Sequence, residues 1–82
     1  MQKLRSFTPS ASWDALPVEQ GMTVEILNNS GALLELRWAH DTDSGHQISL
    51  KDGQSVRLNP SAFVSEIEAQ GAGTDAVSLV IE

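Results

Sequence analysis

The sequence predicts an all-β domain: a small β-sandwich or partly open barrel of roughly five to seven short antiparallel strands, with an extended N-terminal arm. Two observations predict this class. Apolar and polar residues alternate over several short segments, which is the period of a half-buried strand. Turn-forming residues separate those segments, and no long stretch has the period of an amphipathic helix.

The length of 82 residues fits one domain. We divide it into an arm and connection over residues 1–15 and a single β domain over residues 16–82. A chain of this size buries only about 60% of its unfolded surface, and without cysteine it has neither a disulfide nor a thiolate zinc site. We therefore expect association with copies of itself or with a larger protein surface.

The N-terminal segment is basic, whereas the rest of the chain is acidic. Lys3 and Arg5 come before the first acid, Asp14, and removing their two charges from the total of −6 leaves −8 for the remainder. Residues 4–7 suit either a short edge strand or an extended arm. We expect a basic arm to dock on an acidic neighbour, with partner contacts from four residues. These are Lys3, Arg5, Phe7 and Trp13.

A first hairpin is predicted in the middle of the chain. Apolar residues alternate with polar ones over residues 22–28 and again over residues 34–38. Turn-forming residues 29–31 join the two segments. We favour the register that places Glu25 opposite Arg37, because a slip of two residues would oppose two glutamates.

A second hairpin is predicted from residues 46–50 and 54–58, with residues 51–53 as its turn. An odd number of loop residues is expected, because only then do the apolar residues of both strands share a face.

The segment after residue 58 has two interpretations. Asn59 and Pro60 have the positions of residues that begin a helix and Gly71 that of one that ends it, but the alternation over residues 63–69 favours a strand. Residues 76–81 are rich in β-branched side chains and predict a final strand.

Composition excludes several function classes. A net charge of −6 and a pI of about 4.6 disfavour nucleic acid as a partner. The first dozen residues lack the apolar region of a signal peptide, and no apolar run is long enough to span a membrane. Asn28-Asn29-Ser30 matches a glycosylation sequon, which we interpret as a polar turn.

Residues 40–46 gather both histidines with two aspartates. Asp41 and Asp43 could bind a hard cation, and the two histidines could bind zinc, but the further ligands that such sites need are missing. Ser44, His46 and Asp43 could supply a hydrolase triad only if neighbours in one loop reached the required geometry. We therefore predict an exposed polar turn, no metal or cofactor, and no enzymatic activity.

The two tryptophans have different predicted roles. Trp38 continues the apolar face of its strand and is expected in the core. Trp13 lies in a connection, where it could cover one end of the core, anchor an interface or offer a platform to a sugar. Leu27, Leu33 and Val80 fall on the opposite faces of their strands and would form a contact patch if they cluster.

The middle of the chain carries one family resemblance. The strand entry at residues 21–24, the Asn-Ser turn, the strand ending in Trp38, Ser44-Gly45 and the strand entry Gly53-Gln54-Ser55 resemble small virion proteins of tailed bacteriophages. The resemblance covers roughly residues 20–82 and implies a compact β domain that decorates or cements a capsid.

The expected function is therefore a non-enzymatic structural module that assembles, as a homo-oligomer, on a larger protein surface such as a capsid. A carbohydrate- or receptor-binding module and a small acidic inhibitor of a basic enzyme are the alternatives. The expected location is the virion, or otherwise the cytoplasm.

Overall fold

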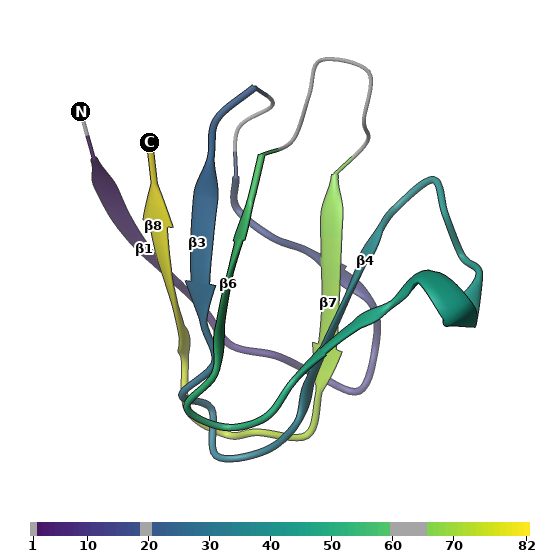
Figure 1. Ribbon diagram of the computed structural model, residues 1–82. Helices are drawn as coiled ribbons and strands as arrows, with labels where there is room; N and C mark the ends of the chain where they lie inside the picture. The colour runs from purple at the N-terminus through teal and green to yellow at the C-terminus, as the bar shows by residue number, and fades with distance from the viewer. Residues whose placement is uncertain (1, 19–20, 60–65) are drawn as a thin grey trace.

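The computed structural model describes residues 2–18, 21–59 and 66–82, whose strands form two four-stranded antiparallel sheets (Figure 1). Sheet A has the order β1-β8-β3-β6 and sheet B the order β2-β7-β4-β5. The elements are β1 (Lys3–Phe7), β2 (Asp14–Ala15), β3 (Val24–Leu27), β4 (Leu34–Trp38), the 3-10 turn η1 (Ser44–His46), β5 (Ile48–Leu50), β6 (Ser55–Leu58), β7 (Ile67–Gly71) and β8 (Val77–Ile81).

The strand pairing follows one rule. The first strand pairs with the last, β2 with β7, β3 with β6, and β4 with β5, as in a long hairpin wound into two layers. The pairs β3–β8 and β4–β7 join these strand pairs into the two four-stranded sheets. This is the arrangement of a jelly roll, so the predicted all-β sandwich is confirmed, with more strands than expected.

The first predicted hairpin is wrong. Its two strands exist, but β3 lies in sheet A and β4 in sheet B. Glu25 lies opposite Arg57 and Val80, and Arg37 lies opposite Glu68. The alternation identified the strands, but the turn at residues 29–31 carries the chain from one sheet to the other.

The second predicted hairpin is wrong for the same reason. β5 pairs with β4 in sheet B, whereas β6 pairs with β3 in sheet A. The turn itself is present, since the amide of Gln54 donates to the carbonyl of Lys51 at 3.0 Å and Gly53 has φ of 89°. It connects two layers rather than two neighbouring strands.

A buried asparagine stabilises both connections that pass between the sheets, β3 to β4 and β5 to β6. The side chain of Asn28 is fully buried, and its Nδ2 donates to the carbonyl oxygens of Ala32 and Leu50, each at 2.8 Å. Its Oδ1 accepts from the amide and hydroxyl of Ser30. The sequon therefore marks a turn, as expected, and one whose amide is part of the interior.

Alternate residues of both sheets fill the space between the layers. The buried apolar set is Leu16, Val24, Ile26, Leu34, Leu36, Leu50, Ile67, Ala69, Val77, Leu79 and Ile81. Trp38 packs against this core, as predicted. The strand interpretation after residue 58 holds for residues 67–71, while residues 60–65 lie outside the described part of the chain.

The N-terminal segment is extended and belongs to both sheets. β1 lies along β8 at one edge of sheet A, so the edge-strand alternative for residues 4–7 is confirmed, and the strand begins one residue earlier (Figure 1). β2 pairs with β7 at one edge of sheet B. No helix within the described ranges is long and apolar enough to cross a membrane.

Candidate functional site

The solvent face of sheet B carries a group of polar and aromatic side chains, which we name the sheet B surface. Arg37 lies opposite Glu68, and Glu35 lies opposite Gln70, on the two central strands. Directly opposite residues share a face, so the inward alternation of Leu34 and Leu36 sends these four side chains outward. Trp13, from the segment before β2, joins them.

Three of these side chains form a fixed cluster. The guanidinium carbon of Arg37 lies 4.2 Å from the ring centre of Trp13, which is cation–π distance. Arg37 Nε also donates to Glu68 Oε1 at 2.9 Å, with only 18% and 21% of the two side chains exposed. The indole and the carboxylate therefore hold the guanidinium in one orientation.

An apolar hollow of about 370 Å³ adjoins this cluster on the same surface, and we name it the sheet B hollow. Its lining residues are Ala11, Leu33, Glu35, Gln70, Gly71 and Ala72. Gln70 Nε2 donates to the carbonyl of Ala11 and so fixes the rim. A Cβ at Gly71 would lie 2.9 Å from the carbonyl of Leu33, so the close strand approach here requires glycine.

Glu35 gives this hollow a charge. Its carboxylate is half-buried, and no hydrogen bond or ion pair joins it to any other described residue. Leu33, at the other side, leaves 46% of its surface exposed. The hollow thus combines apolar walls with one negative group that is unpaired within the described ranges.

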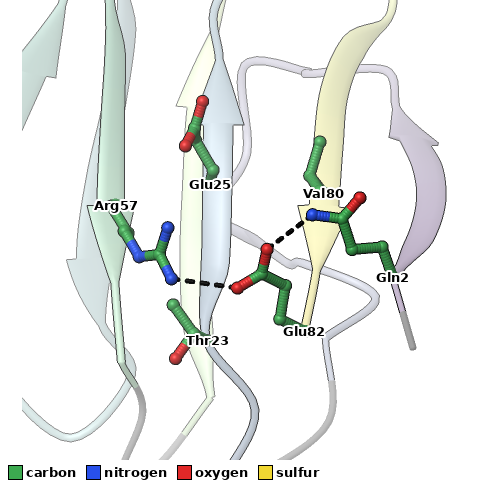
Figure 2. A pocket seen from close by; sticks show the side chains of 6 residues that line it. All are labelled: Gln2, Thr23, Glu25, Arg57, Val80 and Glu82. Carbon is green, nitrogen blue, oxygen red and sulfur yellow. Dashed lines mark hydrogen bonds and ion pairs between the residues drawn. The ribbon is translucent and has the colours of Figure 1, made fainter.

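A second hollow, of about 360 Å³, lies on the outer face of sheet A (Figure 2). Arg57 Nη2 donates to Glu82 Oε2 at 2.9 Å, and Gln2 Nε2 donates to Glu82 Oε1 at 2.6 Å. The bond from Gln2, followed by the charge of Arg57, lowers the pKa of Glu82. Both carboxylate oxygens of Glu82 are therefore occupied, and the hollow contains its own cation.

The loop over residues 40–46 forms a local network. His46 Nδ1 lies 2.8 Å from Asp41 Oδ2, and His46 Nε2 lies 3.7 Å from Asp43 Oδ2. The hydrogen bond with Asp41, aided by its charge, raises the pKa of His46, and the same bond lowers the pKa of Asp41.

Among the described residues, this network has neither the geometry of a hydrolase triad nor that of a metal site. Asp43 caps η1 by accepting from the amide of Gly45. Within the described part of the chain, no hydrogen bond joins Ser44 to His46, and no group of three His, Cys, Asp or Glu residues is placed to hold a metal ion. The residue types of a hydrolase triad are present without its geometry.

The structure separates the four residues predicted to contact a partner. Lys3 and Arg5 are exposed on the edge strand of sheet A, and Phe7 packs against the core. Trp13 lies on the other sheet. The conditional patch of Leu27, Leu33 and Val80 is likewise divided, because Leu27 and Val80 belong to sheet A and Leu33 lies at sheet B.

Sequence reasoning missed Arg37, Glu68 and the hollow. Alternation placed Arg37 on the solvent face of its strand, but Glu68 is 31 positions away and pairs with it only through the β4–β7 register. No local pattern reports such a pairing.

Comparisons with known proteins bear on the fold alone. No protein-family model and no curated protein matches the chain. Among solved structures, a de novo designed double-stranded β-helix determined by solution NMR is similar, with a TM-score of 0.58 and 16% sequence identity. The match covers 100% of this chain and 96% of the designed one, which agrees with the strand pairing described above.

Proposed function

We propose that this chain is a non-enzymatic structural module whose copies associate through the sheet B surface and together decorate a larger protein assembly, such as a virion. The observation that carries the proposal is the cluster of Trp13, Arg37 and Glu68 beside an apolar hollow. Tryptophan and arginine are the residue types that most often dominate binding energy at interfaces. Because the cluster is already ordered, little side-chain entropy is lost on binding.

The filled interior supports a function at the surface. Aliphatic side chains from both sheets occupy the space between the layers. The larger hollows lined by described residues, on the outer faces of sheets A and B, are bounded by strand surfaces rather than enclosed by the sandwich. Contact between surfaces is therefore better supported than conversion of an enclosed substrate. The likeness to small virion proteins of tailed bacteriophages supplies the setting of the proposal.

The geometry of Trp13 disfavours the sugar-binding alternative. A sugar would stack on an open indole face, and the guanidinium of Arg37, 4.2 Å from the ring centre, already occupies one of the two faces and leaves at most one for a sugar. The other polar cluster, at His46, is an exposed network of short side chains without an aromatic platform.

Light scattering across a concentration series tests the proposal. We expect the purified protein to form one discrete oligomer and Trp13→Ala to raise its dissociation constant about tenfold or more. Leu27→Ala, an exposed apolar substitution on sheet A, is the control and should leave association unchanged. Substitutions are preferable to deletion of residues 1–12, because β1 is a strand of sheet A. A monomer at every concentration, or equal effects of the two substitutions, would contradict the proposal.

A further inference from the structure

We infer that the sheet B hollow of one copy receives the basic edge strand β1 of the next copy, in a head-to-tail contact. This inference rests on the proposed function and names the surface that meets the sheet B surface. Its starting point is a separation within one molecule: Lys3 and Arg5 lie at the edge of sheet A, whereas Trp13 lies on sheet B. If two copies meet through different surfaces, Lys3 and Arg5 of one copy can lie beside the sheet B surface of the other.

The charges of the two surfaces are complementary. Lys3 and Arg5 also interact within their own chain, but both stay exposed on five-residue β1, and the rest of the chain has a net charge of −8. Glu35, at the sheet B hollow, has no ion-pair partner among the described residues, whereas Glu68 on the same surface is already bound by Arg37. An incoming cation would therefore meet an available carboxylate.

The apolar parts also match. Leu4 is 81% exposed and lies opposite Val80, on the outer face of sheet A. Lys3 and Arg5 lie opposite the inward Ile81 and Leu79, so β1 must enter the hollow by its free edge for both faces of the strand to make contact. The hollow offers the apolar side chains of Ala11, Leu33 and Ala72. Covering these groups removes apolar surface from water, and the lysine and arginine stems can add to the contact.

The hollow on sheet A is a weaker receptor for the same strand. Arg57 lies within it and binds Glu82, whose second oxygen accepts from Gln2. A second cation would meet Arg57 at close range. On sheet B, Arg37 contacts Glu68 and Trp13 and does not line the hollow. Lys51 does not line it either, so the described residues around this hollow include no cation.

A head-to-tail contact has a consequence that a symmetric contact lacks. Each copy uses one donor surface and one acceptor surface, so a ring forms if the rotation closes. A copy with a damaged donor still accepts, and a copy with a damaged acceptor still donates. Two inactive variants can therefore form one intact interface between them.

The experiment compares two charge-reversal variants by light scattering and native mass spectrometry, with circular dichroism to confirm folding. Lys3→Glu with Arg5→Glu damages the donor, and Glu35→Lys damages the acceptor. Each should raise the dissociation constant about tenfold. An equimolar mixture should restore assembly, because the unmodified pair of surfaces and the doubly reversed pair are both attractive. Glu25→Lys, the matched reversal on sheet A, should assemble as the unmodified chain does.

Three outcomes would overturn the inference. The donor variant could assemble normally, Glu25→Lys could be as harmful as Glu35→Lys, or the mixture could remain monomeric. In the last case the basic residues of β1 act as charges that prevent edge pairing. Loss of assembly in Trp13→Ala together with normal assembly of the donor variant would leave the proposed function standing and remove this inference alone.

Discussion

Asn28 stabilises the fold at the residue scale through bonds that join distant parts of the chain. Its side chain amide reaches the β3–β4 connection at Ala32 and the end of β5 at Leu50. Its backbone amide donates to the carbonyl of Gln54, and its carbonyl accepts from Gly53. One buried residue therefore sets where two connections leave their sheets.

Asn28→Ala should lower the free energy of unfolding by about 3 kcal/mol, because buried groups of Ser30, Ala32 and Leu50 lose their partner. Chemical denaturation measures this change. Asn29→Ala removes an exposed bond of 3.3 Å and should stay within about 0.5 kcal/mol. Similar losses for both variants would show that Asn28 has no special role.

The pair of His46 and Asp41 makes a second residue-scale prediction. Because the folded-state pKa of His46 is raised, its contribution to stability is complete below the unfolded-state pKa and is lost as pH rises through the folded-state pKa. NMR titration should give His46 a pKa above its ordinary value of about 6.5, and Asp41→Asn should remove the increase. An unchanged pKa in the variant would exclude Asp41 as the cause.

At the scale of elements, alternation predicted the strands and failed to predict their partners. Val24 and Ile26 alternate with polar residues, as do Leu34 and Leu36, so both strands were visible in the sequence. Short connections normally favour hairpins, and the crossings depend instead on contacts with distant residues, such as the one from Asn28 to Leu50. Trp13 could be recognised as a surface candidate from its neighbours, but Arg37 and Glu68 meet only through sheet register.

The loop before β8 carries an element-scale prediction. A Cβ at Gly73 would lie 2.6 Å from the carbonyl oxygen of Ser30, which is fixed by the Asn28 network. Gly73→Ala should therefore cost about 2 kcal/mol of stability through forced displacement of the backbone. Gly45→Ala is the control, since its nearest neighbour is a side-chain atom of Asp43 at 3.3 Å. A neutral Gly73→Ala would show that this approach is not tight.

For the whole molecule, the charge distribution distinguishes two kinds of association. Copies with a net charge of −6 repel one another, and salt screens this repulsion. A contact that contains no ion pairs should therefore strengthen as salt is added. A contact between Lys3, Arg5 and Glu35 depends on attraction and should weaken with salt. We expect the dissociation constant of the oligomer to rise between low and high sodium chloride. A falling constant would contradict ionic pairing between copies.

The proposed burial of the sheet B surface between copies can be measured directly. NMR of the isotope-labelled protein with a soluble gadolinium chelate reports the solvent exposure of each site at low and high protein concentration. We predict that the indole of Trp13 and the amides around Leu33 and Ala72 become protected as the oligomer forms, while Leu27, on a strand that is not adjacent to β1, stays accessible. Protection of Leu27 with continued exposure of Trp13 would contradict association through the sheet B surface.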